Sequence, residues 1–421
     1  MSLLDTTVGH GPLTLEYCFE MEFMVAKERP GLEYSEQTDS SDSDGSFLCH
    51  PRWSCPADVH NHYPEILHEC KAVFTKNNEP VVVRSDPESV ASLIWTPRTT
   101  DSWILRPSVH AVPHEGSPSE YEWFGVKLRS PLFPEYELTN PESTVKWCLG
   151  ALRMALRIHV NSTCAFNVIV QASGPGIGLT HFKKLATVVW LTEPEMLARL
   201  GTGLDIDPSK RMRSVTRHSR VAKAPIEGVQ QSRPRDAELA SAMDSHVPEF
   251  HDAVVQEKVQ RLWACQDLPQ LVGALRDSDG RPLAFSLHEP PSRNALGEPT
   301  DTACLAVFRY ALWHPYDDLD VSYFWTQLAL KICRVMETNR ERYQRSARST
   351  DEIIQGFKTK NVEGSSRWKI LMDLFRLGED WYTPWSNIID EYRRGGKLSP
   401  RALDQQSWLG QIPELQIYKS R

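Results

Sequence analysis

The segment that most constrains the fold is residues 13–26, LTLEYCFEMEFMVA, which is rich in residues that favour β-strands. From Cys18 to Phe23, acidic residues alternate with large apolar ones. Because successive side chains of a strand point to opposite faces, Glu20 and Glu22 project from the same face. The segment therefore predicts a strand that carries two neighbouring carboxylates on one side.

Two carboxylates on an otherwise apolar strand are costly to bury unless they meet a cation. That cation could be a metal ion, an arginine or a cationic ligand, whereas a strand side that faces solvent would need none. Arg309, within the strand-like run CLAVFRY, poses the same problem with the opposite charge. A simple structural solution is an ion pair between Arg309 and one of the two glutamates.

Strand patterns dominate the first third of the chain, and helical patterns dominate the last third. We expect strands near residues 80–84, 103–105, 123–128, 166–170 and 304–310, and helices near residues 64–77, 145–159, 180–200 and 322–345. Pro194 should kink or divide the helix at residues 180–200. This order predicts an α+β fold, with helices on one face of an antiparallel or mixed sheet.

The composition, with 40% hydrophobic and 24% charged residues, is typical of a soluble globular protein. A formal net charge of -8 argues mildly against a dedicated nucleic-acid-binding protein. The first residues lack the pattern of a signal peptide, and no apolar run is long enough to span a membrane. Nine scattered cysteines suit a reducing compartment. We therefore expect a cytoplasmic protein without a membrane partner.

A glycine-rich turn follows the strand expected at residues 166–170, in the sequence CAFNVIVQASGPGIGLTHF. A strand, a glycine-rich turn and a helix form many phosphate sites. The third glycine, Gly178, comes one residue early for a dinucleotide fingerprint, and no Lys-Ser/Thr pair completes a Walker A loop. We therefore interpret residues 174–178 as a connection from strand to helix.

Residues 49–70 form a segment rich in cysteine and histidine. Its members are Cys49, His50, Cys55, His60, His62, His68 and Cys70. Their spacing matches structural zinc sites poorly, because such sites pair ligands at shorter, regular gaps. The segment also adjoins residues 35–46, an acidic and serine-rich stretch that should form a mobile loop. Surface residues are the better interpretation, and a zinc site is the alternative.

A basic segment lies within residues 205–236, which we expect to form a polar loop. Its cations are Lys210, Arg211, Arg213, Arg217, Arg220 and Lys223. These side chains could contact the phosphates of a nucleic acid. A solvated loop is the commoner explanation of such a cluster.

The ordered set of strands resembles the amidoligase family of carboxylate–amine ligases, whose fold is related to that of glutamine synthetase and glutamate–cysteine ligase. FEMEF at residues 19–23 is similar to the family's G-x-E-x-E-F strand, and GVKLRSP at residues 125–131 to its GVEIVSP strand. CAFNVIV at residues 164–170 is similar to CGLHVHV, and LAVFR at residues 305–309 to TIEFR. The helical pattern from Lys184 to Glu193 and the WHPYDDLD turn at residues 313–320 complete the match.

The match covers roughly residues 13–345, so it implies an amidoligase-like domain at 1–345 with a helical C-terminal extension at 346–421. The tryptophan-rich C-terminal region and the WHPYDDLD turn resemble fungal members, often of specialised metabolism. The implied fold is a glutamine synthetase-like antiparallel or mixed sheet with helices on one face.

In that family, carboxylates and histidines on these strands ligate Mg²⁺ and position ATP to form an acyl phosphate, which an amine attacks. The resemblance thus implies that Glu20 and Glu22 are metal ligands and catalytic residues, together with Arg309. Lys127 stands where the family has a glutamate, and Asn167 where it has a histidine. A second histidine position is Ile169, and the position of a further glutamate is Val307.

The resemblance leaves three interpretations open. The first is an amide ligase that acts on amino-acid-type substrates with ATP and Mg²⁺; Lys127 then contacts a phosphate or acyl intermediate and Asn167 donates a hydrogen bond. Substrate contacts are implied for Arg129, Ser130 and Trp313.

The second interpretation is a synthase that takes its acyl group from an aminoacyl-tRNA and makes a dipeptide or cyclodipeptide, for example one that contains arginine. Glu20 and Glu22 would then bind a cationic substrate. The tRNA backbone would meet part of the basic segment, namely Lys210, Arg211, Arg213 and Arg217. The third interpretation is a non-catalytic scaffold or ligand-binding protein.

Overall fold

The structure is a computed structural model. It describes residues 13–32, 52–84, 101–113, 117–140, 144–161, 163–173, 177–200, 213–226, 234, 236–289, 302–309, 318–360, 362, 364–379 and 386. These residues fall into two compact units. Unit 1 takes its described residues from 13–17, 167–311 and 323–397, and unit 2 takes its described residues from 18–166 and 312–322.

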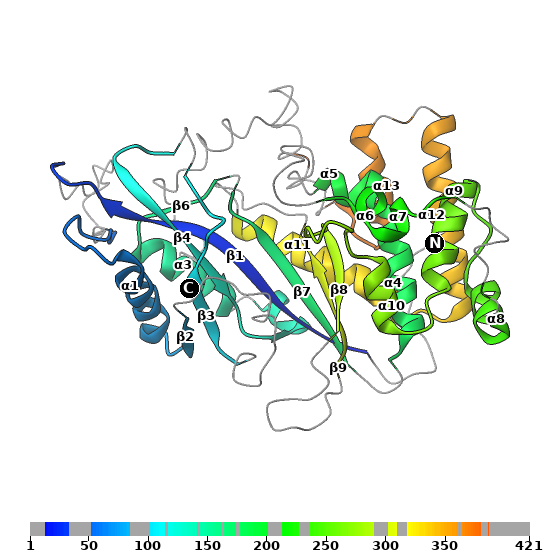
Figure 1. Ribbon diagram of the computed structural model, residues 1–421, viewed down its shortest axis with the longest axis horizontal. Helices are drawn as coiled ribbons and strands as arrows, with labels where there is room; N and C mark the ends of the chain where they lie inside the picture. The colour runs from blue at the N-terminus through cyan, green and yellow to red at the C-terminus, as the bar shows by residue number, and fades with distance from the viewer. Residues whose placement is uncertain are drawn as a thin grey trace. The chain divides into compact units, whose positions relative to one another are not determined.

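Unit 2 is built on a sheet whose strands lie in the order β2 (Val81–Val83), β3 (Trp103–Pro107), β4 (Tyr121–Arg129) and β1 (Thr14–Glu28) (Figure 1). β2 and β3 are parallel, whereas the β3–β4 and β4–β1 pairs are antiparallel. Two short strands, β5 (Phe133–Pro134) and β6 (Ile158–His159), also pair with β1. The part of β1 that belongs to unit 2 begins at Cys18.

One face of this sheet is apolar and packs on a helix. Phe19 and Trp103 meet edge to face, with ring centroids 5.8 Å apart, and Trp103 contacts Phe74 at 4.9 Å. Phe74 belongs to α1 (His62–Lys76), which packs with α3 (Thr144–Ala155). Burial of each of these aromatic side chains stabilises the fold by roughly 1.5–3 kcal/mol. This face is a hydrophobic core of unit 2, and its opposite face carries charged residues.

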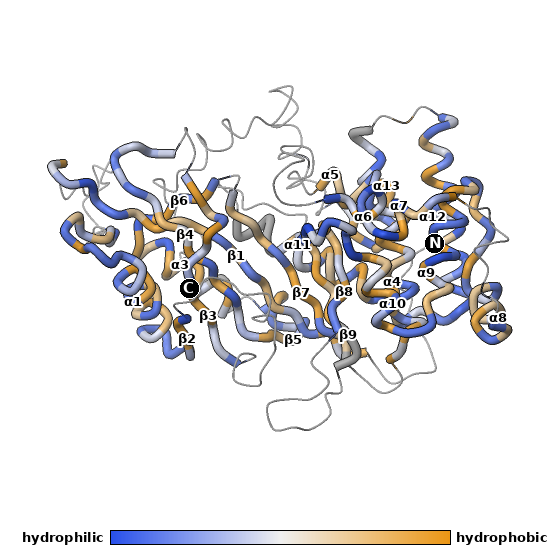
Figure 2. Tube along the Cα trace, viewed as in Figure 1, coloured by the Kyte–Doolittle hydropathy of each residue, from blue (hydrophilic) through white to orange (hydrophobic). Residues whose placement is uncertain are grey.

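Unit 1 contains β7 (Phe166–Ser173), β9 (Thr302–Phe308) and β8 (Phe285–His288), which lie in that order and are antiparallel. The unit includes β7 from Asn167 onward. Figure 2 shows hydrophobic residues along β7. Val168 and Val170 of that strand are buried, as expected for a strand within a core.

Helices make up most of unit 1. They are α4 (Leu179–Thr192), the π-helical turn η3 (Glu193–Leu197), α5 (Ala198–Leu200), α6 (Val215–His218), α7 (Arg220–Lys223), α8 (Ala237–His246), α9 (Ala253–Trp263), α10 (Leu268–Ala274), α11 (Asp318–Cys333, from Tyr323), η4 (Arg334–Glu337), α12 (Arg340–Thr359) and α13 (Gly364–Leu374). A further 3₁₀ turn, η2 (Glu135–Thr139), belongs to unit 2.

Helix α4 is central to unit 1, because it contacts α9, α12, η3 and η4. All its residues from Phe182 to Thr192 are buried, including two lysines. Lys183 Nζ donates to the carbonyl oxygen of Trp263, the last residue of α9, at 2.6 Å, and Lys184 Nζ donates to that of Thr338 at 2.6 Å. The Trp263 carbonyl oxygen ends a helix, where a cation is favourable, and Thr338 follows the 3₁₀ turn η4, so each buried ammonium group has a carbonyl acceptor.

Most of the predicted elements are confirmed, and so is the α+β class with an antiparallel or mixed sheet, because the observed sheet is mixed and mostly antiparallel. α4 ends at Thr192, and the π-helical turn that contains Pro194 follows it, so the division at Pro194 is confirmed. The predicted boundary near residue 345 lies within α12. The acidic residues 35–46 lie outside the described residues, as do residues 174–176 of the glycine-rich turn.

Three local predictions were wrong. The helix expected at 145–159 ends at Ala155, because Ile158 and His159 pair with β1 as strand β6. The helix expected at 322–345 is divided, because the side chain of Asn339 accepts a hydrogen bond from the Arg342 amide at 2.9 Å and starts α12. The polar loop contains two short helices, α6 and α7.

Candidate functional site

The charged side of the unit 2 sheet, which we call the polar face, consists of residues that lie opposite one another on neighbouring strands. In one row, Glu22 of β1 lies opposite Lys127 of β4, which lies opposite Arg106 of β3. In the next row, Glu20 lies opposite Arg129. Because paired residues project to the same side of a sheet, the two predicted carboxylates share a face with three cations.

All five charged residues of the polar face are buried, with exposed fractions from 2% for Arg106 and Arg129 to 7% for Lys127. Lys127 Nζ lies 3.1 Å from Glu20 Oε2. A buried charge of this kind is tolerated only when other charges or hydrogen bonds compensate for its lost hydration. The ion pair between Lys127 and Glu20 provides that compensation inside the protein.

Glu20 is held strongly in its ionised form. Burial alone raises the pKa of its carboxyl group, but Lys127, Arg129 and Arg106 outweigh burial and lower that pKa to about 2. Burial also raises the pKa of the neighbouring Cys18 thiol to about 11, against the opposing effect of Arg129. At neutral pH the polar face therefore holds a carboxylate and a protonated thiol.

Two neutral donors fix the orientation of Glu22. The hydroxyl group of Ser108 donates to Glu22 Oε1 at 2.9 Å, and the amide of Ala165 donates to Glu22 Oε2 at 3.2 Å. Ser108 Oγ in turn accepts from the amides of His110 and Ala111, each at 3.2 Å. These bonds fix the orientation of the Glu22 carboxylate, which a positioned catalytic or binding group requires.

The chain turns over the polar face directly after Ser108, above Gly125. The Ser108 amide donates to the Gly125 carbonyl oxygen at 2.8 Å. A Cβ atom on Gly125 would lie 2.4 Å from the carbonyl oxygen of Ala111 and 2.5 Å from that of Ser108. Asn161 Nδ2 holds the end of this turn by donating to the Val112 carbonyl oxygen at 2.8 Å. The absence of a side chain at Gly125 therefore allows the turn that brings Ser108 to Glu22.

Ser130, an expected substrate contact, is buried and bonded to backbone groups. Its Oγ accepts from the Phe19 amide at 3.0 Å and donates to the Pro131 carbonyl oxygen at 2.8 Å. These bonds tie the end of β4 to β1. Arg129 lies on the polar face, as described above, whereas Trp313 lies outside the described residues.

Arg309 and Asn167 belong to unit 1. Arg309 Nη1 donates to Ser286 Oγ at 2.7 Å and to the Leu283 carbonyl oxygen at 3.2 Å, and its Nη2 lies 3.5 Å from His288 Nε2. Asn167 is half-buried at the start of β7, and its Oδ1 atom has no hydrogen-bond partner among the described residues. The sequence suggested a pair between Arg309 and a glutamate; the cation that the structure places against Glu20 is Lys127.

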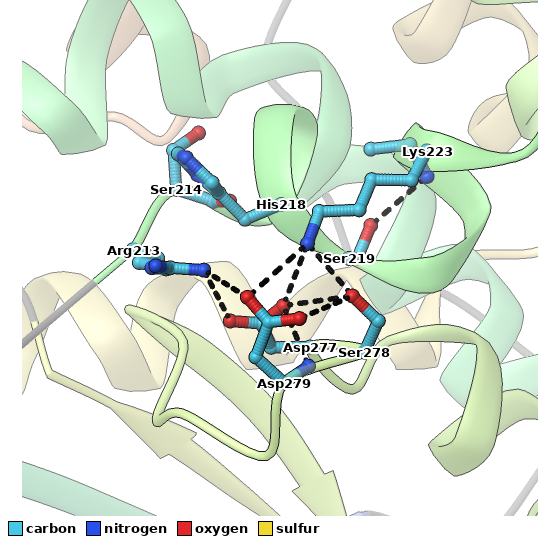
Figure 3. Close-up of polar contacts among 9 residues, drawn as sticks. Arg213, Ser214, His218, Ser219, Lys223, Asp277, Ser278 and Asp279 are labelled. Atoms are coloured by element: carbon cyan, nitrogen blue, oxygen red, sulfur yellow. Dashed lines mark hydrogen bonds and ion pairs between the residues drawn. The ribbon is translucent and has the colours of Figure 1, made fainter.

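The basic segment forms ion pairs with acidic residues of unit 1 (Figure 3). Arg213 Nη1 lies 3.0 Å from Asp277 Oδ2 and 2.9 Å from Asp279 Oδ2, and Lys223 Nζ lies 3.1 Å from Asp277 Oδ1. Burial raises the pKa of Asp277, but hydrogen bonds from Lys223 and from the Asp279 amide lower it overall. The positive charge of Arg213 is thus balanced locally, whereas Arg217 is exposed.

Of the remaining predicted phosphate contacts, Lys210 and Arg211 lie outside the described residues, and so do Cys49 and His50 of the Cys/His segment. The expectation of surface residues was wrong for Cys55 and Cys70, which are buried. Within the described part of the chain, no three His, Cys, Asp or Glu side chains are grouped to hold a metal ion.

Comparisons with protein-family models, with curated proteins and with solved structures found no match for this chain. The resemblance to amidoligases therefore depends on the ordered strand patterns alone. Among the described residues, no helix has the length and the hydropathy needed to cross a bilayer.

Sequence reasoning missed two members of the polar face, Arg106 and Ser108. Both follow the short apolar run Trp103 to Leu105. The signal was available, because Arg106 alternates with Leu105 and Pro107 just as Glu20 alternates with its apolar neighbours. It was not decisive, since the pairing of β3 with β4 cannot be deduced from either strand alone.

Proposed function

We propose that this chain is an amide-bond-forming enzyme of the amidoligase-like class, with a glutamine synthetase-like fold and with the polar face of unit 2 as its active site. One observation supports this proposal above the others. Lys127, which replaces a family glutamate, lies opposite Glu22 and forms an ion pair with Glu20. A fixed ammonium group thus stands among the carboxylates that would otherwise bind a metal ion.

This arrangement favours an acyl donor that arrives already activated. Mg²⁺ needs hard oxygen ligands, usually carboxylates beside the phosphates of a nucleotide. The Lys127 ammonium group already neutralises the Glu20 carboxylate, so a metal ion would have to compete with it for that ligand. An aminoacyl ester, such as an aminoacyl-tRNA, needs no ATP, because its ester bond already carries the activation. ATP and Mg²⁺ dependence is the alternative within the same product class.

The roles of the residues follow from their chemistry. Lys127 would stabilise the negative charge that develops on the acyl oxygen during attack. Glu22, which Ser108 and the Ala165 amide hold in place, would accept a hydrogen bond from the attacking amine. The amine nitrogen bonds to the acyl carbon, the ester C–O bond breaks, and the proton lost by the amine goes to the leaving oxygen.

A direct test is to incubate the full chain with a mixture of amino acids in four arms: no addition, ATP with Mg²⁺, aminoacylated total tRNA, and both. New amides are detected by mass spectrometry. We expect product in the tRNA arm and its loss after ribonuclease treatment. Product that requires ATP and appears without tRNA would favour the metal-dependent alternative, and no product in any arm would contradict the proposal.

Variants connect the activity to the polar face. Lys127→Met and Glu22→Gln should each reduce product formation at least tenfold, whereas the exposed Lys76→Met on α1 should leave it unchanged. Each variant is checked for folding by circular dichroism and urea unfolding. Full activity in folded Lys127→Met would place the reaction elsewhere.

A non-catalytic ligand-binding protein is the second candidate. It is favoured by one observation: Lys127 compensates for the charge of Glu20, and Ser108 and the Ala165 amide hold Glu22, so these contacts stabilise the fold without any catalytic role. In that case the charge variants would change stability, and no amide would form in any arm.

A further inference from the structure

We propose that Ser117 and His159 form a nucleophile–base pair that accepts an acyl group from an activated ester. Ser117 Oγ lies 2.8 Å from His159 Nε2. In the tautomer whose proton is on Nδ1, Nε2 accepts the hydroxyl proton of Ser117. This is the contact by which a histidine activates a weak serine nucleophile.

The two residues are accessible to different degrees. His159 is fully buried, whereas Ser117 is half-buried. A fully buried imidazole ring in contact with a half-buried serine suits a base that acts through its neighbour. A buried imidazole nitrogen needs a hydrogen-bond partner in any case, so the reactivity of Ser117 is what distinguishes a nucleophile–base pair from a structural contact.

The fold holds both residues in place. His159 lies in β6 opposite Met24 of β1, so its position is set by strand pairing. The ring of Trp123 lies against the His159 ring, with centroids 5.0 Å apart. The indole Nε1 of the same Trp123 donates to the carbonyl oxygen of Pro118 at 2.8 Å. One tryptophan therefore positions the base by ring contact and the segment of the nucleophile by a hydrogen bond.

His159 lies on the polar side of the sheet. Met24 and Glu22 are alternate residues of β1, so His159, which is opposite Met24, projects to the same side as Glu22. The two rows are two residues apart along the strand, or about 7 Å. The row of His159 and the row of Glu22 are therefore neighbours on one face of the sheet.

The first chemical step is a transesterification. Ser117 Oγ bonds to the acyl carbon of the ester while His159 Nε2 takes the hydroxyl proton. The bond from the acyl carbon to the leaving oxygen then breaks, and His159 returns the proton to that oxygen. The products are an acyl-Ser117 ester and a free alcohol, and the histidine is regenerated without an added cofactor.

A second step would transfer the acyl group from Ser117 to an amine, and this step alone rests on the proposed function. The first step stands independently and can be measured without knowledge of the natural substrate. The proposal thus names the substrate class, an activated acyl ester.

The test uses a fluorophosphonate probe and p-nitrophenyl acetate on the full chain, with peptide mapping of the adducts. We expect labelling of Ser117 at least tenfold faster than labelling of Ser119, an exposed serine two residues away. Ser117→Ala should abolish the adduct, His159→Gln should slow it at least tenfold, and Ser119→Ala should not affect it. Equal labelling of both serines, or none at Ser117, would overturn the proposal.

A second measurement covers the case in which His159→Gln does not fold. In Ser117→Cys, the imidazole should stabilise the thiolate, so that iodoacetamide alkylates this thiol at least tenfold faster than that of Ser119→Cys. Equal alkylation rates would exclude activation by His159.

The two proposals fail separately. Labelling of Ser117 without any amide product would support the pair and contradict amide formation. Amide formation that persists in Ser117→Ala would support the proposed function and would exclude Ser117 as the acyl carrier of that reaction.

Discussion

Lys127 lies opposite Glu22 in the β1–β4 register, but its ammonium group contacts the carboxylate of Glu20, 3.1 Å away. The lysine therefore reaches diagonally across the sheet, while Glu22 takes its hydrogen bonds from Ser108 and the Ala165 amide. Diagonal neighbours on a sheet face are within reach of long side chains. One cation thus links the two rows of the polar face.

Removal of this cation should be strongly destabilising. In Lys127→Met, the side chain keeps its bulk but Glu20 loses an ion-pair partner, while Arg129 and Arg106 still stabilise its charge. We expect the free energy of unfolding at pH 7 to fall by about 2–4 kcal/mol. Urea unfolding measures this loss, with the exposed Lys76→Met as a control that should stay within about 0.5 kcal/mol.

The double variant Glu20→Gln/Lys127→Met isolates the interaction. Because it removes the carboxylate together with its closest ion-pair partner, it should be more stable than Lys127→Met alone by about 1 kcal/mol or more. If the loss of stability in the double variant equalled the sum of the losses in Glu20→Gln and Lys127→Met, a direct pair would be contradicted.

The free energy of unfolding should fall at acid pH because Glu20 takes up a proton. Its pKa is about 2 in the folded protein, against an ordinary 4.5, so the unfolded chain binds more protons between these values. The stabilisation is complete above pH 4.5 and is lost as the pH falls toward 2. The stability difference between the native protein and Glu20→Gln should therefore be about 2 kcal/mol smaller at pH 3 than at pH 7. An equal difference at both pH values would contradict the lowered pKa.

Glu20 and Glu22 also show how far the sequence predicts this site. The alternation within one strand correctly placed both carboxylates on one face, because that property is local. Their partners depend on how β1 pairs with strands about a hundred residues away, and the sequence indicated Lys127 only through the resemblance to amidoligases. His159 was predicted to end a helix, because the helical pattern before it gave no sign of its pairing with β1. Long-range register, rather than local propensity, decides these features.

At alkaline pH the free energy of unfolding should rise because the buried Lys184 loses its charge. Burial lowers the pKa of its ammonium group from 10.5 to about 8 in the folded protein. Below pH 8, folding must bury a charge at a cost; between 8 and 10.5 the unfolded chain binds more protons, so this cost declines as the pH rises. Relative to Lys184→Met, the native protein should gain about 2–3 kcal/mol between pH 7 and pH 10. Urea unfolding at both pH values measures the gain, and a constant difference would contradict it.

The turn above Gly125 gives the last prediction. An alanine there would bring its methyl group to 2.4 and 2.5 Å from two backbone carbonyl oxygens, which cannot move without displacing the turn. We expect Gly125→Ala to destabilise unit 2 by roughly 1–3 kcal/mol or more. The displacement should also lengthen the hydrogen bond from Ser108 to Glu22, and under the proposed function it should lower amide formation.

The matched control is Gly356→Ala in α12, where a Cβ atom meets nothing within 4 Å. In a helix interior this change should be neutral or should stabilise by up to about 1 kcal/mol. Urea unfolding measures the free energy of unfolding of both variants. If Gly125→Ala were as stable as Gly356→Ala, the turn would have to be free to move away from the sheet, and Ser108 could not be what fixes the orientation of Glu22.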